Sequence, residues 1–162
     1  MTAELPRRLV AEAIGTAILV LFGAGSVVAA LTLGDGQLDY AGLGMVAIAF
    51  AVAIAVVIYA FGTTSGAHIN PAVTIGLAAV GRFHGVRCCV RRCATLGGSV
   101  GAALIVAAFG GDAVDFGTGL TGIADDVGYF QAIVAEAVAT YLLLTAIMAL
   151  AVDRGAPGAG PA

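Results

Sequence analysis

Residues 62–80 read Gly62-Thr-Thr-Ser-Gly-Ala-His-Ile-Asn-Pro-Ala-Val-Thr-Ile-Gly-Leu-Ala-Ala-Val80, a stretch that is apolar at its end yet too short to cross a bilayer. Asn70 is a preferred residue before a helix, and Pro71 suits the first helical position because its missing N–H would be unpaired there anyway. The pattern predicts a half-helix over about 71–80, roughly 15 Å long. A helix of that length reaches about the middle of a membrane, where its N-terminus carries about half a positive charge.

The rest of the chain is unusually apolar. Its 162 residues are 60% hydrophobic and only 10% charged, with a mean hydropathy of +1.06, which excludes a soluble globular protein and a disordered one. Four apolar stretches are candidates for membrane spans of about 20 residues; they run over Leu9–Leu33, Ala41–Phe61, Ala94–Phe109 and Phe130–Val152. The sequence predicts an all-α membrane protein in which the backbone before Pro71 is buried in protein or lines a water-filled cavity.

The arginines indicate how these spans are oriented. All seven fall before the first span, between the second and third, or after the fourth: Arg7, Arg8, Arg82, Arg87, Arg91, Arg92 and Arg154. Because positive residues stay on the cytoplasmic side, both termini are expected to lie in the cytoplasm. The chain is expected to be a multi-pass protein of the cell (plasma) membrane. The net charge of −3 and the absence of lysine argue against a nucleic-acid partner.

One ten-residue string carries a family resemblance. Ser65-Gly-Ala-His-Ile-Asn-Pro-Ala-Val-Thr74 resembles the first Asn-Pro-Ala loop of the aquaporin and glycerol-facilitator (major intrinsic protein) family, and the likeness continues through Ala11-Glu-Ala-Ile-Gly-Thr16, Phe50, Gly81-Arg-Phe83 and Glu136. It implies a passive channel for water and small uncharged solutes, assembled as a homotetramer with one pore per subunit. It implies neither enzymatic activity nor a cofactor.

The resemblance also assigns roles to individual residues. The pore-lining residues that it implies are Phe50, Gly66, His68, Ile69, Asn70, Pro71 and Ala72. Asn70 offers its amide to a solute oxygen, and the positive helix end opposes cations and protons. Phe50 would stand at the outer constriction, where a phenylalanine resembles water-selective members and glycerol facilitators more often carry tryptophan. The alternatives are a packed loop histidine at 68 and a lipid-facing phenylalanine at 50.

Two glutamates lie inside expected spans. Ionisable residues at depth are costly and usually face a partner in the protein interior. The resemblance implies that Glu12 and Glu136 accept hydrogen bonds from re-entrant loops. Each also lies near the start of its span, so a carboxylate that reaches interfacial water is the alternative.

An internal repeat sets the expected organisation. Ala11-Glu-Ala-Ile-Gly-Thr-Ala-Ile-Leu19 recurs as Ala135-Glu-Ala-Val-Ala-Thr-Tyr-Leu-Leu143, and the odd number of intervening spans makes the repeat inverted, as in transport proteins. We therefore expect a first repeat over 1–109, an extracytoplasmic loop over 110–129, the first span of a second repeat over 130–152 and a disordered tail over 153–162. This is an aquaporin-like inverted-repeat bundle truncated to four spans and one half-helix, and we would not expect it to conduct alone. The alternatives are a glycerol-type facilitator, a non-conducting remnant or an interaction subunit.

The entry to the third span is unusual. It reads Arg87-Cys-Cys-Val-Arg-Arg-Cys93. A zinc site at Cys88, Cys89 and Cys93 lacks further ligands, since only His84 is close, so no metal is expected. The remaining interpretations are a basic patch against anionic lipid headgroups and a local shift of reading frame, and the role of the three cysteines stays open. Further along the same span, Gly97 and Gly101 form a GxxxG pattern that lets helices approach closely.

Overall fold

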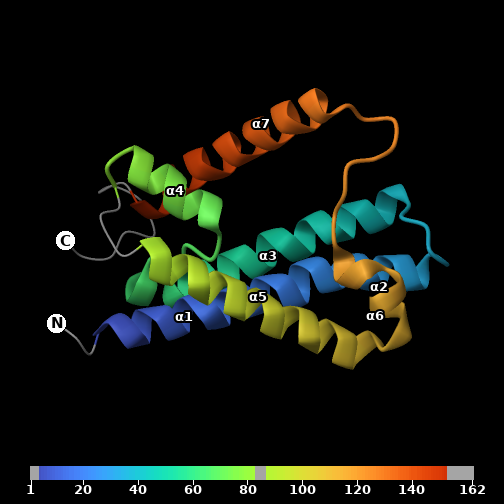
Figure 1. Ribbon diagram of the computed structural model, residues 1–162, viewed down its shortest axis with the longest axis horizontal. Coiled ribbons are helices and arrows are strands. Elements are labelled where there is room, and N and C mark those ends of the chain that lie inside the picture. Colours follow the sequence, from blue (N-terminus) through green and yellow to red (C-terminus); the bar gives the residue numbers. More distant parts are fainter. Residues whose placement is uncertain (1–3, 83–86, 153–162) are drawn as a thin grey trace. The chain divides into compact units, whose positions relative to one another are not determined.

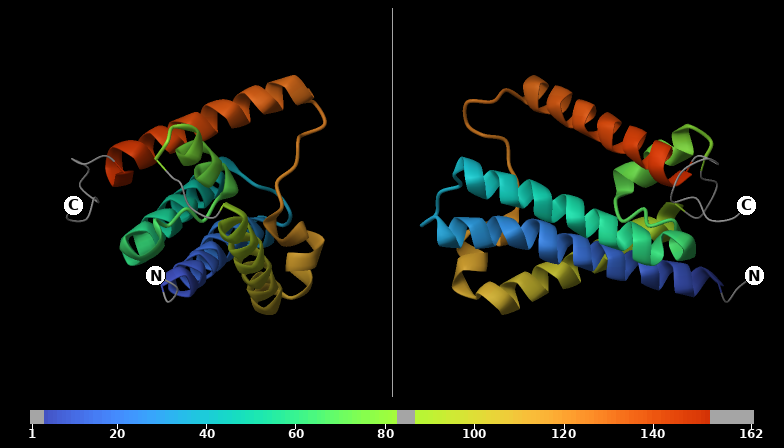
Figure 2. Two further views of the ribbon diagram at one scale, coloured as in Figure 1. Left: turned by 60° about the vertical axis from the view of Figure 1, so that its left-hand side comes forward. Right: turned by 180° about the vertical axis from the view of Figure 1, so that it is seen from behind.

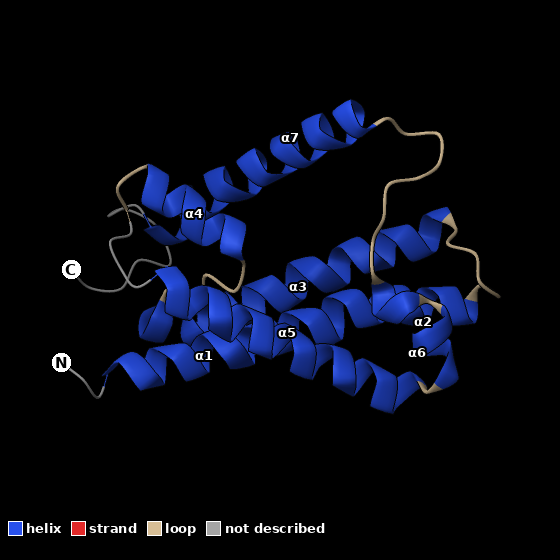
Figure 3. Cartoon of the chain, viewed as in Figure 1, coloured by secondary structure: helices blue, strands red, loops and turns tan. Residues whose placement is uncertain are grey.

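A computed structural model of the chain describes residues 4–82 and 87–152, with side chains over 5–82 and 93–150. Every regular element in these described residues is a helix (Figures 1 and 3), so the prediction of an all-α protein is confirmed. The chain forms two compact units, one over residues 1–71 and 86–120 and the other over 72–85 and 121–162. Each unit is described by itself below.

The first unit is built on two long helical rods. One rod consists of α1 (Glu4–Leu19), a π-helical turn η1 (Val20–Ala24) and α2 (Gly25–Leu33), and the other is α3 (Tyr40–Ser65). Both views of Figure 2 show them side by side and running in opposite directions. The Asp39 carboxylate starts α3 by accepting a hydrogen bond from the Gly42 amide at 2.6 Å, and Gly66 ends it with a left-handed φ of 92°. The rods contain the first two expected spans and extend them by several residues.

Helix α5 (Arg87–Phe109) packs in parallel against the first rod. A side chain on Gly97 would collide with the Ala13 carbonyl oxygen, and a Cβ on Gly101 would lie only 2.8 Å from the Ala17 carbonyl oxygen. The contacts advance in the same order along both helices, which makes the helices parallel. Small residues at this spacing bring the two backbones into contact, as the GxxxG pattern predicted.

The spans differ in one respect from the expectation. Three described helical segments are long and apolar enough to cross a membrane: Leu5–Leu33, Tyr40–Ser65 and Tyr129–Leu150. The third expected span is a helix that begins at Arg87, seven residues before Ala94, but only Cys93–Phe109 of it is apolar. Arginine is a good helix former, so the helix also includes the polar stretch before Ala94, which the apolar pattern had left out of the expected span.

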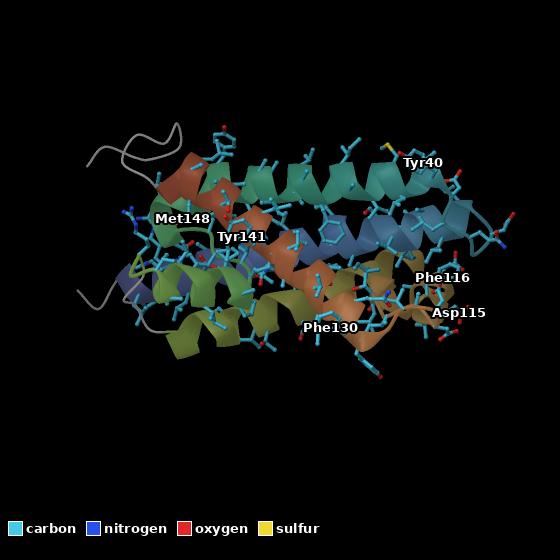
Figure 4. All side chains as sticks on the ribbon, turned by 90° about the horizontal axis from the view of Figure 1, so that it is seen from above. Tyr40, Asp115, Phe116, Phe130, Tyr141 and Met148 are labelled. Atoms are coloured by element: carbon cyan, nitrogen blue, oxygen red, sulfur yellow. The ribbon has the colours of Figure 1, made fainter. Side chains whose placement is uncertain are left out.

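The segment expected to be a loop after α5 contains two short helices. These are α6 (Gly111–Asp115) and the 3-10 turn η2 (Gly117–Gly119). They form because Ala113 is fully buried in an apolar cluster with Val28 and Ile105, against which Phe116 also packs. Figure 4 shows Tyr40, Asp115 and Phe116 toward the same end of this unit.

The second unit contains α4 (Pro71–Ala79), α7 (Tyr129–Ile147) and a π-helical turn η3 (Met148–Val152). Helix α4 is one residue shorter than the predicted half-helix. A side chain on its Gly76 would meet the Leu144 side chain of α7. Gln131 accepts a hydrogen bond from the Gly128 amide at 2.9 Å where α7 begins. None of the α7 residues is buried, and Figure 4 shows Phe130 and Tyr141 in succession along α7, followed by Met148 where η3 begins. The expected disordered tail lies outside the described residues.

Candidate functional site

The candidate site is the five-residue loop over 66–70 that joins α3 to α4. Its backbone is unusual because two residues with side chains, Ala67 and Ile69, adopt positive φ values of 46° and 41°. Each such residue costs on the order of 1–3 kcal/mol and persists only where its surroundings hold it in place. The Asn70 amide also donates to the His68 carbonyl oxygen across Ile69, which closes a tight turn. The loop therefore stores strain immediately before a helix N-terminus.

The Glu12 carboxylate holds this loop. Glu12 is 2% exposed, and its two oxygens accept separate hydrogen bonds, one from the His68 amide at 3.0 Å and one from the Ile69 amide at 2.7 Å. An N–H to carboxylate bond is stronger than one between neutral groups. These amides belong to no helix, so the carboxylate supplies the acceptors that a buried backbone requires.

Two hydroxyl groups complete the polar support. The Ser65 hydroxyl accepts a hydrogen bond from the Ala67 amide at 3.1 Å. The Thr16 hydroxyl donates to the Glu12 carbonyl oxygen at 2.8 Å and lies 3.5 Å from the Ile69 carbonyl oxygen. One turn of α1 and the last residue of α3 thus enclose the loop.

The side chain of Ile69 lies in the apolar core. Val57, Ala67 and Ile69 form a buried cluster between α1 and α3. A Cβ on Gly15 would lie 2.8 Å from Ile69 Cγ2 and 2.7 Å from Val57 Cγ1, so this glycine makes the room that the cluster occupies. The pore-lining role expected of Ile69 stays a prediction, and it concerns the peptide group because the side chain is part of this core.

The other expected site residues are distributed as follows. His68 is buried, Asn70 is half-buried, and Gly66, Pro71 and Ala72 are exposed. These five residues are close because they are neighbours in the sequence. Glu12 contacts the loop from α1.

The two other expected residues belong to long helices. Phe50 lies in the middle of α3. This half-buried residue packs its ring beside Gly23 of η1. Glu136 is exposed on α7 in the second unit. No group of three or more metal-ligating side chains occurs among the described residues, and of the three cysteines only the side chain of Cys93, half-buried, falls within them.

Sequence reasoning quoted Gly15, Thr16 and Ser65 only as members of the resembling strings, and it assigned no role to them or to Gly23. Gly15 and Thr16 stand within the string that recurs at 135–143, but the second copy replaces the glycine with Ala139. No pattern in the sequence marks a glycine whose missing side chain admits a neighbour from another helix.

The sequence matches the profile of the Major intrinsic protein family over residues 1–161. The chain belongs to this family. It is 42% identical over 172 residues to the probable aquaporin AqpM of Archaeoglobus fulgidus, an alignment that covers 97% of this chain and 70% of that protein. It is 42% identical to aquaporin AqpM of Methanothermobacter marburgensis, covering 95% of this chain and 69% of that protein. It is 37% identical to aquaporin Z of Photorhabdus laumondii, in an alignment that covers 96% of this chain and 70% of that protein.

Family membership confirms the resemblance on which the sequence analysis relied. Together with its long apolar helices, it makes this major intrinsic protein a multi-pass membrane protein. The prediction that the chain is not an enzyme is confirmed by the same match, because the relatives are aquaporins.

Proposed function

We propose that this major intrinsic protein forms a passive pore for water, and that the loop over 66–70 with the first turn of α4 lines its narrow middle. The observation that carries the proposal is the strained loop held by the buried Glu12 carboxylate. Backbone strain of this kind is found at ligand-contacting sites. The aquaporin names of the relatives are consistent with water as the solute.

The chemistry of the loop suits a neutral solute. Irregular backbone at membrane depth is tolerated where it lines a water-filled path. The N-terminus of α4 directs a positive partial charge toward that path, which favours a water oxygen and opposes cations and protons. We assign the Asn70 amide to contact with the passing water. Phe50 at the outer constriction favours water over glycerol in this proposal.

The remaining assignments are part of the same proposal. The chain lies in the plasma membrane with both termini on the cytoplasmic side, because the arginines flank the spans on that side. The subunits assemble as a homotetramer, and the second copy of the repeat begins the inverted half, in which Glu136 supports a second loop.

The test is water permeability of the purified chain in proteoliposomes. Stopped-flow light scattering after a hypertonic shock should show faster shrinkage than in empty vesicles. This is the opposite of the expectation, drawn from the single half-helix, that the chain does not conduct alone. Asn70→Asp keeps the size of the side chain but replaces the donor with an acceptor, so water permeability should fall. Gln37→Glu, the same change from amide to carboxylate on an exposed side chain, is the matched control and should leave water permeability unchanged. Shrinkage at the rate of empty vesicles would reject the pore and favour a non-conducting remnant or interaction subunit.

Orientation is tested separately in cells. In a chain with Cys88, Cys89 and Cys93 replaced by serine, a cysteine introduced by Asp112→Cys should react with a membrane-impermeant maleimide added outside. A cysteine introduced by Arg8→Cys should react only after the membrane is permeabilised. The reverse pattern would place the termini outside.

A further inference from the structure

The first rod contains a π-helical turn, η1, between α1 and α2. At its end, the amide of Gly25 lies within bonding reach of the carbonyl oxygens of Val20, Phe22 and Gly23. The Ser26 hydroxyl donates to the Gly23 carbonyl oxygen at 2.6 Å and so gives this irregular turn an additional partner. Single π-helical turns inside α-helices are frequent at functional sites.

Gly23 in this turn receives the ring of Phe50. Gly23 is buried, and a Cβ built on it would lie 2.7 Å from Phe50 Cδ1 and 2.9 Å from Cζ. The first of these distances is 0.7 Å short of the 3.4 Å at which ordinary van der Waals contact begins. A glycine is therefore required at position 23 for the ring to occupy its place. Phe50 is only half-buried, so part of the residue stays accessible while the ring packs against the rod.

We infer that Gly23 and the π-helical turn set the position of the Phe50 ring and thereby determine the size of solute that this protein admits. The inference rests on the proposed function, in which Phe50 stands at the outer constriction. A methyl group on residue 23 would move the ring away from the rod, toward its accessible side. If Phe50 stands at the outer constriction, as the proposed function has it, that movement narrows the path and excludes glycerol more strongly than water.

The inference is tested by comparing two solutes in one preparation. Proteoliposomes with the native chain, Gly23→Ala or Gly44→Ala are assayed for water and for glycerol permeability. We expect the ratio of glycerol to water permeability to fall roughly tenfold in Gly23→Ala, the lower end of what one methyl group discriminates in a tight site. Gly44→Ala is the matched control, because a Cβ on Gly44 of α3 has nothing within 4 Å, and the ratio should not change.

A double-variant cycle separates positioning from general damage. In a Phe50→Ala background the ring is absent, so adding Gly23→Ala should leave the ratio unchanged. If Gly23→Ala lowers both permeabilities by the same factor, or shifts the ratio equally with and without the ring, the inference is overturned. If Gly23→Ala alone does not give folded protein, recovery by the smaller Phe50→Leu supports the contact, and failure to recover overturns it. A native chain without water permeability rejects the proposed function, and the inference falls with it.

Discussion

Replacement of Glu12 by alanine is expected to release the loop before α4. The carboxylate accepts the amides of His68 and Ile69, at 3.0 Å and 2.7 Å, from a position that is 2% exposed. Without it, two buried N–H groups lose their acceptor. Each such loss costs about 1–3 kcal/mol, which gives about 2–6 kcal/mol for the pair.

The strain of the loop acts in the same direction. Ala67 and Ile69 hold positive φ values at about 1–3 kcal/mol each, so relaxation of both releases about 2–6 kcal/mol. The two quantities are similar, and the native loop conformation therefore depends on the carboxylate. A loss of even 2 kcal/mol raises the population of open loop about 30-fold, because about 1.4 kcal/mol corresponds to a factor of ten.

Hydrogen–deuterium exchange in lipid nanodiscs measures this population. The amides of His68 and Ile69 should exchange at least about 30-fold faster in Glu12→Ala. Glu12→Gln keeps one acceptor oxygen and should give an intermediate rate, whereas Glu136→Ala, exposed on α7, should give the native rate. Unchanged exchange at both amides in Glu12→Ala would refute the reasoning, since the carboxylate would then not be what holds the loop.

Three further predictions concern stability, each measured by thermal or SDS-induced unfolding in lipid micelles. Gly97→Ala should destabilise the chain by about 1–3 kcal/mol through overpacking against the Ala13 carbonyl. The control Gly98→Ala should not, because the nearest atom to its Cβ would be 3.9 Å away. Equal effects of the two substitutions would contradict the described α1–α5 contact. Thr32→Val should stabilise it by about 1 kcal/mol, because the Thr32 hydroxyl is buried with no hydrogen-bond partner among the described residues; a loss of stability would reveal a partner. Asp39→Ala should cost about 0.5–2 kcal/mol by removing the cap of α3, and Asp39→Asn should recover most of it.

The local signals in the sequence were sufficient for the half-helix. Pro71 has a fixed φ and lacks an amide hydrogen, and both properties act within one residue of the helix start. The helix accordingly runs over Pro71–Ala79, against a predicted 71–80. The first two spans were similarly accessible, because their apolar composition is continuous over more than twenty residues.

The orientation of individual loop side chains was not accessible. Ile69 was expected at a pore surface, but its side chain packs against Gly15 and Val57. In a helix or strand a fixed period relates neighbouring side chains, whereas in a loop with positive φ values no period exists. Which residue faces inward there depends on contacts with α1 and α3, and those form only in the folded chain.

Long-range packing also decided the segment after α5. Its glycines and aspartates predicted a loop, and α6 formed there because Ala113 and Phe116 reach the cluster around Ile105. The Glu12 contact with the loop bridges more than fifty residues of sequence. Only the family resemblance suggested it, since no spacing rule connects positions so far apart.

The π-helical turn at Val20–Ala24 has a consequence for how the first rod can change. A π turn contains one residue more than an α turn but covers nearly the same rotation, so it offsets everything beyond it by about 100° from where an uninterrupted α-helix of the same sequence would place it. In such an uninterrupted helix Val28, fully buried against Ile105, would turn away from its cluster, while Glu12 would keep its place beside the loop. The turn thus acts as a phase shift between two ends of a single span, and it allows each end to present the face that its own neighbours require.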